Sequence, residues 1–201
     1  MSETKSIKKQ LRMEALARRD QLDAGYRIEV AMKLSDEAGL VALDPGEVVS
    51  GFLPIRTELD IRPLMMALAA RGARLCVPAM IDRQTIEFRA LVRGSPLIDN
   101  GFGTLAPPPE AERLHPGLML MPLAAFDASG NRIGYGAGYY DRAIAGLRAA
   151  GLRPRLIGMA FDCQEVEAVP AEAHDVPLDA VWTESGLRPF DKVRQAGGDM
   201  R

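Results

Sequence analysis

The sequence predicts an α/β fold: a single-domain, three-layer αβα sandwich with a mainly parallel, Rossmann-like sheet. Helical and extended patterns alternate along the chain, as expected where crossover helices join parallel strands. The chain has 201 residues, 47% of them hydrophobic, which is enough to bury one core but leaves little room for two. We therefore expect one domain over residues 1–201, with a core of about residues 6–190 and a flexible tail at 191–201.

The predicted elements follow one another in a regular order. Apolar residues recur at helical spacing in residues 6–20, 26–40 and 61–71, and Gly72 is suited to end the third helix. Val48 to Leu53 is expected to be a buried strand. The remaining extended segments share apolar, strand-forming residues: 73–80, 85–92, 117–124 and 155–161. A helix over about residues 139–150, which Gly151 would end, connects the last two strands. In such a sheet, ligands gather at the carboxyl ends of the strands.

Composition excludes several classes of protein. A formal net charge of -2 and a pI near 5.8 argue against a nucleic-acid partner, which would require a basic surface. No apolar run approaches the ~20 residues of a membrane span, and the start MSETKSIKKQ lacks the apolar core of a signal peptide. A soluble, cytoplasmic protein is expected. Cys76 and Cys163 each lie in an apolar stretch, and we expect ordinary buried thiols there rather than a disulfide, a metal site or a nucleophile.

The segment from Ser95 to Gly117 is too rich in proline and glycine to form regular structure. It is also long for a structureless connection inside a compact domain. Long connections of this kind are often functional, so we expect this one to contribute to a site.

A glycine-rich segment, RIGYGAGYYDRAI from Arg132 to Ile144, predicts an anion site. Glycines at 134, 136 and 138 could turn successive N–H groups toward one phosphate, and a helix follows at once. The N-terminus of that helix would add free N–H donors and a partial positive charge. Asp141 would lie in the first turn, where a magnesium ion could be shared with a phosphate. The spacing matches neither GxxxxGK[ST] nor GxGxxG, so a tightly packed turn without a ligand is the alternative.

Charged residues elsewhere leave two interpretations open. Lys8, Arg12 and Arg19 lie along one side of the first helix, either as a solvated basic face or as phosphate ligands. Glu58 follows a strand, where it could start a helix or face a ligand. The pair formed by His174 and Asp175 is by itself typical of a loop or helix cap.

The stretch PLAAFDASGNRIGYGAGYYDR, Pro122 to Arg142, resembles the signature of the 5-formyltetrahydrofolate cyclo-ligase family, also called 5,10-methenyltetrahydrofolate synthetase. The resemblance includes KKQLR at 8–12, FLPIRTELD at 52–60 and HDVPLDAVWTE at 174–184, and so covers nearly the whole chain. It implies a monomeric, ATP- and Mg²⁺-dependent enzyme that converts 5-formyltetrahydrofolate, or its polyglutamates, to 5,10-methenyltetrahydrofolate. ADP and phosphate are released after the formyl oxygen is phosphorylated.

The resemblance also implies a role for individual residues. Asp141 and Asp175 would hold magnesium, and Arg132 and Tyr140 would be catalytic. The ATP site would consist of basic side chains and the glycine segment: Lys8, Arg12, Arg132, Gly134, Tyr135, Gly136, Ala137, Gly138, Tyr139 and Tyr140. The folate would be bound at its pterin end by Glu58, with further contacts from Leu53, Phe102 and Tyr140.

The chain departs from the family pattern at Tyr135 and Ala137, positions at which relatives often have arginine, lysine or glycine. Fewer cationic side chains should then surround the phosphates, and backbone amides should carry more of the binding. Two other functions remain open on these residues. A folate- or nucleotide-binding regulatory protein could retain the glycine segment without turnover, and a sugar-phosphate isomerase or acyl-CoA transferase could share a similar sheet.

Overall fold

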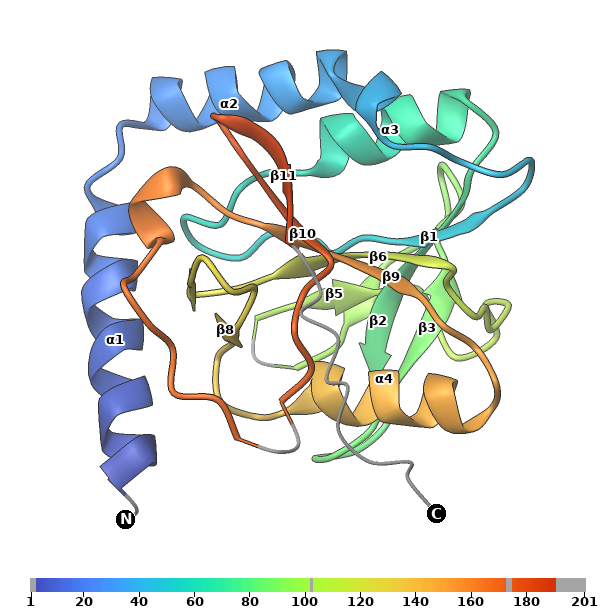
Figure 1. The fold of residues 1–201 in the computed structure, drawn as a ribbon. Coiled ribbons are helices and arrows are strands. Elements are labelled where there is room, and N and C mark those ends of the chain that lie inside the picture. The colour runs from blue at the N-terminus through green and yellow to red at the C-terminus, as the bar shows by residue number, and fades with distance from the viewer. Residues whose placement is uncertain (1–2, 102, 173–174, 191–201) are drawn as a thin grey trace, which may run out of the picture.

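The computed structural model describes residues 3–101, 103–172 and 175–190. Its centre is a seven-stranded sheet (Figure 1), with strands in the order β11 (Gly186–Pro189), β10 (Ala180–Thr183), β9 (Arg155–Met159), β6 (Leu118–Pro122), β1 (Val48–Ser50), β2 (Arg74–Met80) and β3 (Ile86–Ala90). The five strands from β10 to β2 are parallel, whereas β11 and β3 add antiparallel edges. The mainly parallel sheet predicted from the alternating pattern is confirmed.

Helices cover both faces of the sheet, as predicted. Figure 1 shows α2 (Ala24–Asp36) and α3 (Arg62–Ala70) on one face and α4 (Tyr139–Ala149) on the other. Because successive side chains of a strand point to opposite faces, β6 contributes to two cores. Leu118 and Leu120 pack in the core that includes α2 and α3, and Met119 and Met121 pack in the core that includes α4. Residues 118–121 of β6, which lie between the helix layers, are therefore apolar without interruption.

The first helix covers neither face. Helix α1 (Glu3–Asp20) runs along the side of the sandwich (Figure 1), where it contacts the 3₁₀ turn η2 (Asp162–Gln164) and β7 (Ala125–Phe126). Strand β7 pairs with β8 (Arg132–Ile133) in a small antiparallel hairpin between β6 and α4. This hairpin displaces the glycine segment from the end of β6 and brings it beside α1.

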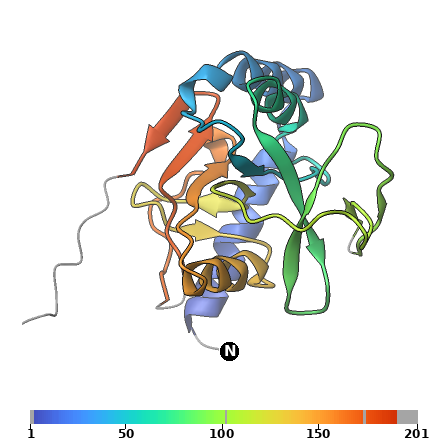
Figure 2. The ribbon, with the colours of Figure 1, turned by 90° about the vertical axis from the view of Figure 1, so that its right-hand side faces the viewer.

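The structure differs from the predicted elements mainly in short helical turns and short strands that the sequence pattern did not show. The helix expected over 26–40 ends at Asp36, and a separate 3₁₀ turn, η1 (Ala38–Leu40), follows. The short strands β7, β8, β10 and β11 were not predicted. Among its described residues, the long segment 95–117 contains a short hairpin of two-residue strands, β4 (Ile98–Asp99) and β5 (Leu105–Ala106), and an isolated bridge from Arg113 to Arg89, and is otherwise irregular. Figure 2 shows the segment on the same side of the molecule as β2 and β3.

Both predicted glycine stops are confirmed. Gly72 and Gly151 have φ of +96° and +84°, a backbone conformation that side chains with a Cβ rarely adopt. After α4, Gly151 N–H donates to the Arg148 carbonyl and Leu152 N–H donates to the Leu147 carbonyl, which closes the helix. The free end of α4 is thus its N-terminus, which the glycine segment adjoins.

Three further expectations can be compared with the described residues. Cys76 is buried and Cys163 partly buried, and both are free thiols; burial raises the pKa of Cys76 to about 12, so it is unreactive at neutral pH. The described helices include none that is both long and apolar enough to cross a membrane. The predicted tail at 191–201 lies outside the described residues.

Candidate functional site

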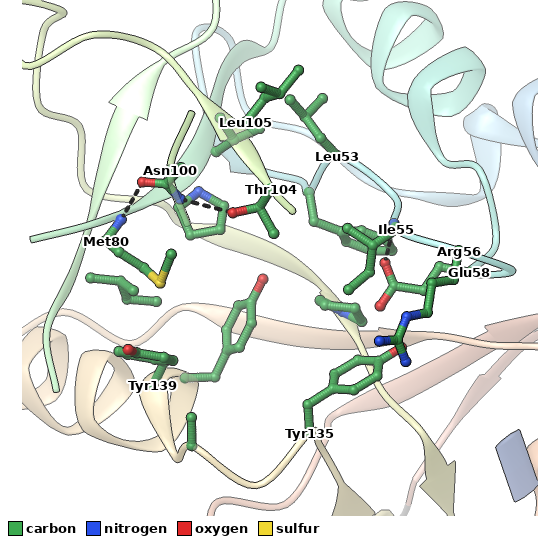
Figure 3. A pocket seen from close by; sticks show the side chains of 17 residues that line it. Leu53, Ile55, Arg56, Glu58, Met80, Asn100, Thr104, Leu105, Tyr135 and Tyr139 are labelled. Atoms are coloured by element: carbon green, nitrogen blue, oxygen red, sulfur yellow. Dashed lines mark hydrogen bonds between the residues drawn. The ribbon is translucent and has the colours of Figure 1, made fainter. Parts of the chain in front are cut away.

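A cavity of about 550 Å³ lies between the β2–β3 hairpin, the segment after β1 and the glycine segment (Figure 3). Its walls are mostly apolar, with Leu53 among them, while Glu58 and Tyr140 are among the polar groups that line it. The structure therefore brings together three residues predicted to contact one substrate. Phe102 lies outside the described residues, although Asn100 and Thr104 of the same loop line the cavity.

Glu58 is the buried carboxylate of this cavity, with 8% of its surface exposed. Ile55 N–H donates to its Oε2 at 2.9 Å, and the Tyr135 hydroxyl lies nearby at the same end of the cavity. Burial raises the pKa of Glu58, although Tyr135, the Ile55 N–H, Arg19 and Arg56 oppose the shift. Arg19, which is distant in sequence, and Arg56 both approach Glu58 in the fold.

Arg19 is 2% exposed, so the solvated basic face considered for the first helix is wrong at this position. Its Nη1 donates to the Tyr135 hydroxyl at 3.0 Å and its Nε to Thr57 Oγ1 at 3.1 Å. Figure 3 shows Tyr135, Arg56 and Glu58 at one end of the cavity. The Tyr135 side chain therefore lies on the cavity side of the glycine segment.

Tyr140 lines the same cavity and belongs to the first turn of α4. Its hydroxyl is buried and has no hydrogen-bond partner among the described residues. Burial raises the pKa of Tyr140 well above its ordinary value, so the hydroxyl keeps its proton and can donate. An unpartnered buried hydroxyl is costly, which is a reason to expect a ligand acceptor or a water molecule there.

The glycine segment leads into the N-terminus of α4, as the sequence predicted. Gly136 has φ +99° and Gly138, the residue that precedes the helix, has φ +67°. Gly134 does not adopt a positive φ; its carbonyl accepts a hydrogen bond of 2.7 Å from Arg12 Nε. A Cβ at Gly136 would also approach the Arg12 guanidinium at 3.5 Å. Arg12 therefore supports the backbone of the segment, and burial lowers the pKa of Arg12 below its ordinary value.

A charged cluster lies beside the glycine segment and outside the cavity; we define it as Lys8, Glu172, Asp175, Arg132 and Asp141. Lys8 Nζ donates to Asp175 Oδ2 at 2.6 Å and to Glu172 Oε2 at 2.9 Å. Burial acts to lower the pKa of Lys8, but these two carboxylates outweigh it and raise that pKa. Lys8 is 13% exposed at its side chain, so it does not belong to a solvated face.

The second pair in the cluster joins Arg132 to Asp141. Arg132 Nη2 donates to Asp141 Oδ1 at 2.6 Å, its Nη1 donates to the Val176 carbonyl, and its side chain is 7% exposed. Val176 N–H in turn donates to Asp141 Oδ1 at 3.4 Å. Because Val176 follows Asp175 directly, the two aspartates predicted to bind magnesium come to the same side of the molecule. His174 lies outside the described residues.

The carboxylates of the charged cluster are the groups that could bind magnesium. Within the described ranges, no group of three or more His, Cys, Asp and Glu side chains could hold a metal ion. Two carboxylates alone are nevertheless a suitable set for magnesium when phosphate oxygens and water supply its other ligands. Asp141 and Asp175 fit that requirement, each held in place by a cation of the chain.

Sequence reasoning gave no individual role to four residues of the site: Arg56, Glu172, Asn100 and Thr104. Arg56 lies inside the FLPIRTELD segment, and Asn100 and Thr104 lie in the long loop that was expected to contribute to a site. Arg19 was considered as a phosphate ligand or as part of a solvated face, and its contact with Tyr135 was not predicted. The φ of Arg56 is +53°, the only positive value at a non-glycine position in the described ranges, and no local pattern indicates it.

Comparison with known proteins adds independent findings. A family model described as the 5-formyltetrahydrofolate cyclo-ligase family matches residues 4–184. The chain is 34% identical over 143 residues to 5-formyltetrahydrofolate cyclo-ligase of Escherichia coli (strain K12), covering 68% of this chain and 78% of that protein. It is 26% identical over 178 residues to the protein of that name from Haemophilus influenzae, covering 85% and 94%.

Among solved structures, that of Aquifex aeolicus 5,10-methenyltetrahydrofolate synthetase is similar over 97% of this chain and 96% of that chain. The TM-score is 0.74 at 26% sequence identity. The predicted fold class is confirmed by this likeness.

Proposed function

The chain belongs to the 5-formyltetrahydrofolate cyclo-ligase family of enzymes, and we propose that it converts 5-formyltetrahydrofolate to 5,10-methenyltetrahydrofolate, with ATP as co-substrate and Mg²⁺ as cofactor. One observation carries the proposal. Tyr140 and Asp141 are neighbours in the first turn of α4, yet Tyr140 lines the cavity and Asp141 belongs to the charged cluster. A ring in the cavity and a phosphate at the cluster would thus meet at the N-terminus of one helix.

The cavity suits the pterin ring of the folate. A carboxylate has about four lone-pair sites, and among the described residues Ile55 N–H uses one of those of Glu58. The remaining sites can accept the paired hydrogen bonds that the pterin amino group and ring N–H offer. Leu53 and the neighbouring apolar side chains would pack against the flat ring.

The N-terminus of α4 and the charged cluster suit the phosphates of ATP. The first N–H groups of α4 and those of the glycine segment are donors for an anion. Lys8, Arg12 and Arg132 add positive charge close by, two of them already oriented by Asp175 and Asp141. When bound between these aspartates, Mg²⁺ would neutralise phosphate charge.

The chemistry requires positioning more than a protein nucleophile. The N5 formyl group is an amide, and its carbonyl resists attack by the weakly basic N10. Transfer of the γ-phosphoryl group to the formyl oxygen releases ADP and makes that oxygen a leaving group. N10 then bonds to the formyl carbon and loses its proton, and the C–O bond breaks to release phosphate. Lys8, Arg132 and the N–H groups of the glycine segment would stabilise the charge on the transferring phosphoryl group.

A spectrophotometric assay tests the proposal. Purified protein should form methenyltetrahydrofolate from 5-formyltetrahydrofolate when ATP and Mg²⁺ are both present, and not when either is omitted. Release of ADP and phosphate should match product one to one. Binding of folate and ATP without product, under conditions in which the E. coli enzyme is active, would contradict the proposed activity.

A further inference from the structure

Three segments that are distant in sequence meet behind Glu58. Arg19, in α1, donates to the Tyr135 hydroxyl of the glycine segment at 3.0 Å and to Thr57, the neighbour of Glu58, at 3.1 Å. The Tyr135 hydroxyl and the Glu58 carboxylate lie at the same end of the cavity, close enough for each to influence the pKa of the other. A tyrosine hydroxyl has one proton, so it can accept from Arg19 while its proton is turned toward Glu58. Tyr135 therefore lies between the Arg19 guanidinium and the Glu58 carboxylate.

Burial makes the positions of Arg19 and Glu58 energetically important. Arg19 and Glu58 are 2% and 8% exposed, so neither charge is well hydrated. The groups that face Glu58 are Arg19 from α1, Arg56 and Ile55 N–H from its own segment, Tyr135 from the glycine segment and Tyr140 from α4. Arg19 is the buried cation among them, and in the described residues both of its hydrogen bonds go to hydroxyl groups. Two carboxylates can balance its charge: Glu58, beyond Tyr135, and Asp20, which accepts a hydrogen bond from Thr57.

We propose that Arg19 and Tyr135 are positioning residues for the folate: through Tyr135, Arg19 orients the Glu58 carboxylate and keeps it in the charged form that accepts hydrogen bonds from the pterin. The inference rests on the proposed function and extends it. It moves the Tyr135 side chain from the ATP half of the site to the folate half. Tyr135, whose position often carries another residue in relatives, is in this chain the link between α1 and the carboxylate of Glu58.

A merely structural role for Tyr135 makes different predictions, so a double-mutant cycle separates the two. The variants are Tyr135→Phe, Glu58→Gln and the double variant, and the Kd of 5-formyltetrahydrofolate is measured by calorimetry. Tyr135→Phe should raise the Kd about tenfold, as expected when a charged acceptor loses one hydrogen bond. In the Glu58→Gln background, the same change should alter the Kd by no more than about twofold. Equal effects in both backgrounds would overturn the inference.

The pH profile is a second readout that loss of packing alone would not move. The pterin binds the charged carboxylate, so folate affinity should fall as pH is lowered through the pKa of Glu58. Tyr135→Phe removes a donor to the charged form, so this fall should occur at higher pH than in the wild type. Glu58→Gln should lack this pH-dependent step. An unchanged midpoint in Tyr135→Phe would contradict the proposed role.

Each substitution has a matched control: a similar substitution at a residue outside the site. Tyr26→Phe removes a tyrosine–carboxylate hydrogen bond, that of Tyr26 with Glu184 at 3.0 Å, and should leave the folate Kd unchanged. Arg19→Lys keeps the charge but loses the planar group that reaches Thr57 and Tyr135 together, and should weaken folate binding. The matched control is Arg18→Lys. Arg18 precedes Arg19 in α1 and donates to the Cys163 and Glu165 carbonyls, so this change should leave folate binding unchanged. Wild-type protein that binds no 5-formyltetrahydrofolate would refute the proposed function itself, whereas wild-type binding that Tyr135→Phe leaves unchanged would refute only the positioning role.

Discussion

The cavity and the charged cluster lie on two sides of one helix N-terminus. The surroundings disfavour the charged form of Glu58 in the cavity and favour the charged form of Lys8 in the cluster. In the cavity, Glu58 receives a hydrogen bond from the neutral Ile55 N–H, and burial raises its pKa, which disfavours the charged form. In the cluster, carboxylates raise the pKa of Lys8, which favours its charged form. A raised pKa thus has opposite meanings for an acid and a base. The cavity is prepared for a mostly neutral ring with a few donors, and the cluster for an ionic ligand.

The largest effect is expected from breaking the more buried pair of the cluster. Arg132→Met would leave Asp141 and the Val176 carbonyl without their guanidinium partner. Turnover should fall at least about a hundredfold, because charge on the phosphoryl group is no longer neutralised. Unfolding free energy should fall by about 3 kcal/mol, as expected when one partner of a buried pair is removed. Steady-state kinetics and denaturant titration measure both.

The exposed pair of Arg74 and Glu112, 51% and 61% exposed, provides the control for Arg132→Met. Arg74→Met should cost less than about 1 kcal/mol and leave turnover unchanged. If the two variants behaved alike, the charged cluster would be no more than a surface feature.

The next largest effect is expected in the cavity. Glu58→Gln keeps the size of the side chain but replaces an acceptor oxygen with a donor NH₂, which would oppose the pterin donors. The Kd of 5-formyltetrahydrofolate should rise by about 10- to 100-fold. ATP binding, assigned to the other side of α4, should be unchanged in calorimetry. Retained folate affinity together with weakened ATP binding would mean that the two halves are assigned the wrong way round.

A smaller effect is expected for Lys8→Met, which should weaken ATP binding by about tenfold through loss of one charge-assisted contact. The sequence placed Lys8 and Arg12 on an exposed helix face, from which their removal would leave folding intact. The structure corrects this, since Lys8 joins α1 to Glu172 and Asp175. Stability should therefore fall by about 1–2 kcal/mol, measured by denaturant titration. Lys33→Met, at an exposed pair with Glu37, should cost less and leave ATP binding intact.

The smallest expected effect is a pH dependence of stability at Glu58. Its folded-state pKa is raised above the ordinary 4.5, so the folded protein binds a proton more tightly than the unfolded chain. This contribution is fully present below pH 4.5 and is lost as pH rises through the folded pKa. Glu58→Gln cannot titrate but leaves Arg19 without the Glu58 charge, so the expected signal is the pH trend: relative to the wild type, the variant should gain stability as pH rises through the folded pKa and lose it on acidification. Melting curves at several pH values test this, and a pH-independent difference would rule it out.

Much of the fold could be predicted because it is encoded locally. Apolar periodicity located the long helices and the strands of the parallel sheet, and Gly72 and Gly151 marked two helix ends correctly. Strands β10 and β11 were missed although AVWT at 180–183 is rich in strand-forming residues, and a two-residue turn before Gly186 signals a hairpin. The hairpin of β7 and β8 has only two residues in each strand, too few to show a period.

The candidate site was predicted in its membership more than in its arrangement. The glycine segment and the acidic residues Asp141, Asp175 and Glu58 were identified from motifs, and the structure places Glu58 with Leu53 and Tyr140 in one cavity. Their partners could not be predicted, because a pairing such as that of Lys8 with Asp175 joins residues 167 positions apart.

The sequence by itself therefore determined the elements, the glycine turns and the chemical groups available to a ligand. Only the tertiary structure decided which charges are buried and what balances them. Arg12 and Arg19 lie on the same side of one helix, yet Arg12 holds the backbone of the glycine segment, whereas Arg19 is buried against Tyr135. Spacing along a helix fixes the face on which a side chain lies, but the segment that covers that face comes from more than a hundred residues away, and its approach sets hydration and charge.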